Sequence, residues 1–204
     1  SYGVEQFVQD GRVDDVDDLQ PLVETYLRNQ IGTADLVALR AAHAAATEAD
    51  LDSVCDADRR LAAVTLAAEF RESAEQSGAR LLSLHRDLGA APLVERYAER
   101  VEHDDAPGHY PVVLGAVAEG AGIDERTACL VCCHGFVTGL LGAAQRLLSV
   151  GHTDTQRMLD DLQPAIRDAV SDSATRTVDG VTSFTPFVDV LSAEHERADR
   201  RLFL

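Results

Sequence analysis

Apolar residues recur with the period of an α-helix along almost the whole chain, and this pattern restricts the fold more than any other. Between residues 16 and 27 they share one helix face, at Leu19, Leu22, Val23, Tyr26 and Leu27. No stretch shows the alternation of a β-strand, and no repeat of fixed period occurs. We therefore predict an all-α fold, a single-domain helical bundle of about eight to ten helices that spans residues 1–204.

Glycine, proline and capping residues set the expected helix boundaries. Gly32 and Thr33 are expected to interrupt the helix that begins near residue 16. Asp58 is a candidate N-cap for a following helix, and Pro92 suits the first turn of another. Asp124 is expected to cap a long helix that ends near residue 148. These signals predict helices joined by short connections.

Two segments lack this helical pattern, and a third is expected to form the last helix of the chain. Residues 103–111 contain two prolines and a glycine, which predicts a loop. Residues 171–185 are polar and lack periodicity, so we expect a mobile loop there. Residues 187–203 have the apolar spacing of a C-terminal amphipathic helix.

Charge excludes two broad classes of partner. Asp and Glu number 35 against 18 basic residues, all of them Arg, which gives a net charge of −17. A nucleic-acid binder needs a basic patch that displaces counterions from phosphates, and an anionic membrane surface also attracts basic segments. We therefore expect neither nucleic acid nor a membrane as partner.

Residues 128–145 carry no formally charged side chain and reach the lower length limit of a membrane span. Within them, Gly135 and Gly139 have the spacing that lets transmembrane helices approach closely. His134, Thr138 and several small residues make the stretch only moderately apolar. A buried central helix, surrounded by other helices, is the favoured interpretation, with the glycines allowing close backbone approach.

The four cysteines do not form a disulfide framework. Cys129, Cys132 and Cys133 share one helix face beside His134, and Cys55 lies far upstream. Thiolates at this spacing can bind zinc, but a structural zinc site needs a second ligand pair, which the chain lacks. Free cysteines pack well inside helical cores, so we predict buried, reduced thiols in a cytoplasmic protein.

Other polar clusters have simpler interpretations than catalysis. His103 and His109 flank two aspartates and are expected to lie in a solvated loop, although a weak metal contact there is an alternative. His195 and Glu196 resemble the start of a zinc-protease helix, but Asp199 occupies the place of the second histidine. We predict no enzyme activity, no bound cofactor and no resident metal, and expect the protein to act by binding others.

Several unusual short strings follow one another in a fixed order along the chain. They are Ser1-Tyr2-Gly3-Val4-Glu5, Glu69-Phe70-Arg71-Glu72-Ser73, Gly108-His109-Tyr110-Pro111, Ala143-Ala144-Gln145-Arg146-Leu147, Gly151-His152-Thr153-Asp154-Thr155-Gln156-Arg157, Ser192-Ala193-Glu194-His195-Glu196 and Arg201-Leu202-Phe203. In their order and spacing these strings resemble the UreF family of urease accessory proteins, and the resemblance covers essentially the whole chain.

Three departures from the family pattern stand out. Family members often carry Pro-Leu-Gly-Gln where this chain has residues 149–152, which removes the glutamine. Family members usually carry an apolar segment before the N-terminal motif, whereas this sequence begins at the motif, with Ser1. The family ending Arg-Leu-Phe-Arg-Ser stops at Leu204, without the last basic residue.

The resemblance implies an all-α maturation factor that transforms no substrate itself. Members of the family form homodimers, bind the accessory protein UreD (also called UreH) and recruit the GTPase UreG, so that nickel reaches apo-urease. Nickel and GTP then belong to the partners. The alternatives are an unrelated acidic helical scaffold or regulatory domain and, third, a Cys/His metal carrier built on residues 129–134.

Two groups of residues are the hypothesised partner-binding sites. The first group, matched to the N-terminal and central motifs, is a candidate contact for UreG: Tyr2, Glu5, Arg146, Asp154, Gln156 and Arg157. The second, matched to the C-terminal motif, is a candidate contact for UreD, with Phe203 as an aromatic anchor: His195, Glu196, Arg197, Arg201, Leu202 and Phe203. For the first group the alternative is a structural one, in which Arg146 and Arg157 pair with Glu5, Glu69 or Asp154 to hold helix ends. For the second it is that the C-terminal helix seals the protein's own core.

Overall fold

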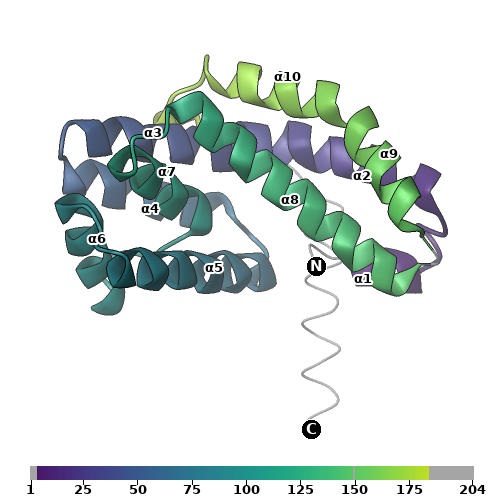
Figure 1. Cartoon of the computed structure of the whole chain (residues 1–204), viewed down its shortest axis with the longest axis horizontal. Helices are drawn as coiled ribbons and strands as arrows, with labels where there is room; N and C mark the ends of the chain where they lie inside the picture. Colours follow the sequence, from purple (N-terminus) through teal and green to yellow (C-terminus); the bar gives the residue numbers. More distant parts are fainter. Residues whose placement is uncertain (1–3, 149, 184–204) are drawn as a thin grey trace, which may run out of the picture.

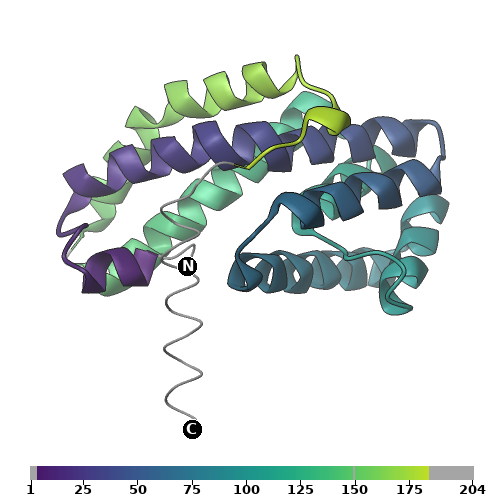
Figure 2. The ribbon, with the colours of Figure 1, turned by 180° about the vertical axis from the view of Figure 1, so that it is seen from behind.

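The structure is a computed structural model that describes residues 4–148 and 150–183. Every regular element in this part is helical, and no strand occurs among these residues, which confirms the all-α prediction. The predicted C-terminal helix 187–203 lies outside the described residues. Two views of the ribbon show the helices gathered into two groups (Figures 1 and 2). The long helical segment of residues 16–47 runs through both groups.

The first half of the chain contains a continuous helical segment from residue 16 to residue 47. Helix α1 covers Val4–Gln9 and precedes it. The segment comprises α2 (Val16–Tyr26), the π-helical η1 (Leu27–Asp35) and α3 (Leu36–Thr47). The expected interruption at Gly32 and Thr33 is therefore wrong. The backbone there widens into a π-helix and continues, and Gly32 lets α10 pass close by, because a Cβ on it would lie 3.3 Å from the Ala169 Cβ.

Four helices form the group at one end of the molecule. They are α4 (Leu51–Val64), α5 (Ala68–Asp87), α6 (Pro92–Glu102) and α7 (Tyr110–Gly120). Pro92 opens α6 as predicted. Asp58 does not cap a helix: α4 begins earlier, where the Asp50 carboxylate accepts the Ser53 amide at 3.1 Å, and Asp58 lies buried inside it.

The last helices lie along the other side of the long segment. They are α8 (Glu125–Leu147), α9 (His152–Asp161) and α10 (Gln163–Ser173), followed by a short 3-10 turn, η2 (Val178–Gly180). The Asp124 carboxylate caps α8 as predicted, accepting the Thr127 amide at 2.9 Å. The expected loop 171–185 begins later than predicted, because α10 continues to Ser173, and Val181 is buried.

Two clusters of buried apolar side chains hold the fold together. One is built on α1, α2, η1, α8, α9 and α10, and the other on α4, α6 and α7. Helix α3 contributes to both, through Leu36 and Leu39 on one side and Val37 and Ala42 on the other. Burial of these apolar surfaces is the main favourable term in folding.

Helix α8 is only half enclosed, which corrects the prediction of a helix buried all round. By length and composition it could cross a membrane, but 56% of its most apolar window is buried inside the protein. Its outer face exposes Val131, His134, Gly135, Thr138 and Gly139. None of these residues contributes to the formal net charge at pH 7, in which histidine counts as neutral. A Cβ added to either glycine would meet nothing within 4 Å, so neither glycine serves close packing against another helix of the described residues.

Candidate partner-binding surface and polar pocket

Part of the predicted partner-binding set lies outside the described residues. These are Tyr2 and the whole C-terminal group, His195, Glu196, Arg197, Arg201, Leu202 and Phe203. The other five predicted residues are described: Glu5 on α1, Arg146 near the end of α8, and Asp154, Gln156 and Arg157 on α9.

The three helices that carry these five residues meet at one end of the molecule. Helix α1 packs against α8, and α9 packs against α8 and α2, so α1 and the junction of α8 with α9 lie together (Figure 1). The Gln145 side-chain amide donates to Thr155 Oγ1 at 3.1 Å and lies 3.2 Å from His152 Nδ1. This contact fixes the turn between α8 and α9. We call the exposed end formed by α1, the last turn of α8 and α9 the α1–α9 surface.

Most predicted residues on the α1–α9 surface face solvent. Glu5, Arg146, Gln156 and Arg157 are exposed, and Asp154 is partly exposed. Arg157 Nη1 lies 3.5 Å from Asp154 Oδ1, so one of the suggested Arg–carboxylate pairs is present. Pairs of Arg146 with Glu5 or Glu69 do not occur among the ion pairs of the described residues. Exposed pairs contribute little to stability, so these side chains can exchange partners at low cost.

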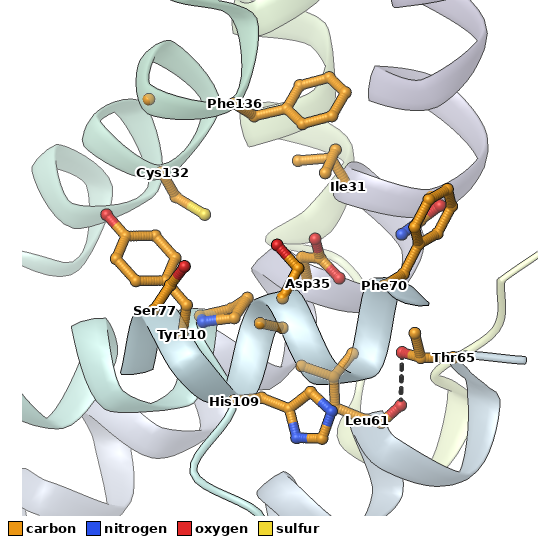
Figure 3. Close-up of a pocket in the computed structure, with 15 residues that line it drawn as sticks. Ile31, Asp35, Leu61, Thr65, Phe70, Ser77, His109, Tyr110, Cys132 and Phe136 are labelled. Carbon is orange, nitrogen blue, oxygen red and sulfur yellow. Dashed lines mark hydrogen bonds between the residues drawn. The ribbon is translucent and has the colours of Figure 1, made fainter. Parts of the chain in front are cut away.

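A pocket of about 230 Å³ lies between η1, α4, α5, the start of α7 and α8 (Figure 3). Its walls are largely apolar and aromatic, with Ile31, Phe70, Tyr110 and Phe136 around it. The rim includes two exposed residues, Ser73 on α5 and Gly135 on the outer face of α8. A volume below about 300 Å³ is smaller than most small-molecule sites and suits a single side chain.

The carboxyl group of Asp35 lies in the middle of this pocket (Figure 3). No hydrogen bond or ion pair from another described residue reaches it. Burial raises the pKa of this carboxyl to about 7, and the nearby His109 imidazole offsets part of that effect. Asp35 is partly exposed, so its carboxyl has lost part of its water, and the described residues supply no Arg partner for it. This situation favours the neutral form of an acid.

A fully buried carboxylate, Asp58, fixes the wall of the same pocket. It accepts four hydrogen bonds: from Tyr97 Oη at 2.6 Å, from the Gly108 amide at 2.7 Å, and from the His109 amide and Nδ1 at 3.0 and 3.1 Å. Four donors compensate a carboxylate that is fully removed from water. Burial, and then the Asp58 charge, raises the pKa of the Tyr97 hydroxyl well above its ordinary value, so Tyr97 remains a donor.

The four hydrogen bonds to the Asp58 carboxylate, which we call the Asp58 clamp, also fix the orientation of His109. Because the Asp58 carboxylate only accepts, Nδ1 carries the hydrogen, and in the neutral ring Nε2 is left as an acceptor. His109 is 1% exposed, and its Nε2 has no hydrogen-bond partner among the described residues. The expectation that His109 lies in a solvated loop is therefore wrong, whereas His103 is exposed as expected.

The cysteines are buried as predicted. Burial raises the pKa of the Cys129 thiol to about 11 and that of Cys133 to about 12, and it raises the pKa of Cys132 well above its ordinary value. Thiols in this state are poor nucleophiles and poor metal ligands. Within the described ranges, no group of three His, Cys, Asp or Glu side chains is placed to hold a metal ion.

The sequence motifs do not predict this pocket. Asp35 belongs to none of them, Asp58 has the position expected of a cap, and His109 has that expected of a solvated loop residue. One signal was available: Asp58 lies on the same helix face as the buried Val54 and Leu61. An acid at an otherwise apolar position indicates a buried carboxylate with partners elsewhere in the chain.

Comparison with known proteins now defines the class of the protein. Residues 13–163 match the family model described as UreF. The chain is 33% identical over 207 residues to the urease accessory protein UreF of Trichodesmium erythraeum, with 100% of this chain and 88% of that protein covered. It is 33% identical over 203 residues to the protein of the same name from Yersinia enterocolitica serotype O:8, covering 100% and 89% respectively.

Such a match, over the full chain and with an all-α fold, defines an accessory protein of urease. The chain belongs to the UreF family.

Proposed function

We propose that the protein is a cytoplasmic, non-catalytic adaptor of urease maturation. It binds UreD and recruits the GTPase UreG to apo-urease, so that the partners deliver nickel. The observation that supports this role best is the α1–α9 surface, where Glu5, Arg146, Gln156 and Arg157 face solvent on fixed helix ends. Exposed side chains on a rigid scaffold are suited to recognition because little order is lost on binding.

The contact for UreG is assigned to this α1–α9 surface, and the contact for UreD to the C-terminal residues 195–203. The two contacts then use different parts of the chain. An adaptor of this kind needs two separate sites, because each partner must remain bound while the other arrives. Within the described residues, the raised thiol pKa values and the absence of a three-ligand group speak against the metal carrier as the alternative.

A homodimer is also part of this proposal. Leu84 and Leu88 lie four residues apart at the end of α5 and are 53% and 74% exposed. Residues at this spacing share a helix face, and exposed large apolar side chains in a group are typical of protein interfaces. We assign the dimer contact to this leucine pair. Leu88→Arg should give a monomer by sedimentation velocity, whereas Leu66→Arg, at an isolated exposed leucine, should leave the dimer intact.

Co-purification tests the adaptor role. Tagged chain is mixed with UreD alone, UreG alone and both together, and bound protein is quantified. The expected result is capture of UreD alone and of UreG only when UreD is present, with nickel-dependent urease activity restored by the complete set. Capture of neither partner, or full urease activation without this chain, would contradict the proposal.

A further inference from the structure

The Asp35 pocket contains a carboxyl group that has no Arg partner among the described residues. Its formal negative charge therefore lacks a permanent counter-ion in this part of the chain. The other elements contribute neutral polar side chains to the pocket, and one imidazole that acts on the Asp35 charge. These are Thr65, Ser73, Ser77, Tyr110 and the Cys132 thiol, and the imidazole of His109. The missing partner is therefore a group that donates hydrogen bonds and carries positive charge.

We infer that this pocket receives the guanidinium group of an arginine side chain presented by a partner protein. A guanidinium is planar, offers five N–H donors and binds a carboxylate through two parallel hydrogen bonds. Its flat faces also pack well on aromatic rings, which Phe70, Tyr110 and Phe136 supply here. The ammonium of a lysine would match the charge but not the flat, aromatic walls.

The size and position of the pocket point to a protein partner rather than to a free metabolite. About 230 Å³ accommodates one side chain, and the opening at Ser73 and Gly135 adjoins the uncharged outer face of α8. That face offers apolar contact to the polypeptide around the inserted arginine. A second copy of this chain is not the expected occupant, because the homodimer contact is assigned to Leu84 and Leu88 on another face, at the end of α5.

The probe for this site is N-acetyl-arginine methylamide, which carries the side chain and a short backbone. The full chain, labelled with 15N, is titrated with it while amide signals are followed by NMR. We expect saturable shifts at pocket residues such as Ser77 and Gly135, with a dissociation constant in the millimolar range. The citrulline analogue, which is neutral and of nearly the same shape, should bind at least tenfold more weakly, and the lysine analogue several-fold more weakly.

Matched variants show whether Asp35 is responsible. Asp35→Asn should weaken probe binding at least tenfold. Asp160→Asn, at an exposed aspartate on α9, makes the same charge change and should leave the affinity within twofold. Thermal unfolding of both variants confirms that they are folded. Equal affinity of Asp35→Asn and wild type, or of the citrulline and arginine analogues, would overturn the inference.

A third variant separates a partner's arginine from the chain's own C-terminal residues. Arg197, Arg200 and Arg201 are replaced together by alanine, and the titration is repeated. An unchanged affinity supports a site that is open for a partner. If the probe binds only to this triple variant, the pocket belongs to the chain's own tail and the partner assignment is wrong. The experiment needs no other urease component, so its failure would not bear on the maturation role.

Discussion

Gly78 on α5 and Gly108 before α7 approach so closely that a side chain at position 78 has no space. A Cβ built on Gly78 would lie 1.9 Å from the Gly108 carbonyl oxygen and 3.1 Å from the Tyr110 amide nitrogen. Both neighbours are backbone atoms, which cannot rotate away as a flexible side chain can. This contact holds α5 against the loop that carries His109 and so forms one wall of the pocket.

Replacing Gly78 by alanine should therefore destabilise the protein, by about 2 kcal/mol or more. Urea unfolding followed by circular dichroism measures the change. Gly139→Ala is the matched control, since a Cβ there meets nothing within 4 Å. That substitution should stabilise the helix by roughly 0.5–1 kcal/mol, because alanine loses less backbone entropy than glycine. Equal stability of the two variants would show that α5 does not contact the loop in this way.

Asp58 should be the most sensitive polar residue of the core. Asp58→Asn removes the charge that four donors surround, and we expect a cost of about 3 kcal/mol or more. Tyr97→Phe removes only one of those donors and should cost about 1 kcal/mol. Hydrogen exchange of the Gly108 and His109 amides should accelerate in Asp58→Asn. If Tyr97→Phe proved as costly as Asp58→Asn, the clamp would not be centred on the carboxylate.

Asp35 should make stability depend on pH in a specific direction. Its carboxyl has an ordinary pKa of 3.8 when unfolded and one of about 7 when folded. Between these values the native state holds a proton that the unfolded chain releases, so stability falls as pH rises through this window. The imidazole of His109 lowers the pKa of Asp35. The charge of Asp35 in turn raises the pKa of the Cys132 and Cys133 thiols.

Asp35→Asn should remove this pH dependence. At pH 8 the variant should be more stable than wild type by about 2 kcal/mol, roughly half of the full effect of such a pKa change, because the pocket is open to water on one side. Near pH 4 the two proteins should unfold at similar urea concentrations. A difference that stays constant between pH 4 and pH 8 would contradict a raised pKa of the Asp35 carboxyl in the native state.

The four cysteines should be inert in the native protein. All four are buried, and burial raises the pKa of each thiol. Ellman's reagent, which reacts with thiolates, should label the native chain negligibly over the time in which it labels the urea-unfolded chain completely. Rapid labelling of Cys132 or Cys133 without denaturant would show that this part of α8 opens readily.

A charge reversal on the α1–α9 surface should separate binding from stability. Arg157 is 74% exposed and its pair with Asp154 is long, so Arg157→Glu should change the unfolding free energy by less than about 0.5 kcal/mol. We expect it to reduce UreG recruitment in the co-purification at least tenfold. Arg126→Glu, at the opposite end of α8, makes the same charge change and should leave recruitment intact. Loss of recruitment in both variants would indicate a general charge effect rather than a local contact.

Features determined by neighbouring residues were predictable from the sequence. Helical periodicity, the cap at Asp124 and the proline at the start of α6 each depend on contacts within a few positions. Even so, the interruption expected at Gly32 does not occur. The packing of α10 against η1 compensates a glycine that would weaken an isolated helix.

The pocket depends on contacts between distant parts of the chain and could not be predicted in the same way. Asp58 accepts hydrogen bonds from Tyr97 and Gly108, which lie 39 and 50 positions further along the chain. Asp35 lies beside residues of α5 and α8 only in the folded protein. Contacts between residues so far apart in the sequence leave no local sequence pattern. The motif residues on α1, α8 and α9 lie far apart in the sequence, and the fold brings these helices together at the α1–α9 surface. Their role in binding UreG stays a prediction.

The unbroken helical segment from residue 16 to residue 47 contributes side chains to both apolar clusters. Bending the molecule between them would break successive backbone hydrogen bonds of this segment. The described residues therefore offer no ready hinge between the two clusters. The distance between the α1–α9 surface and the Asp35 pocket is set by this helical segment, so a molecule bound at one site would stay at a fixed distance from a molecule bound at the other.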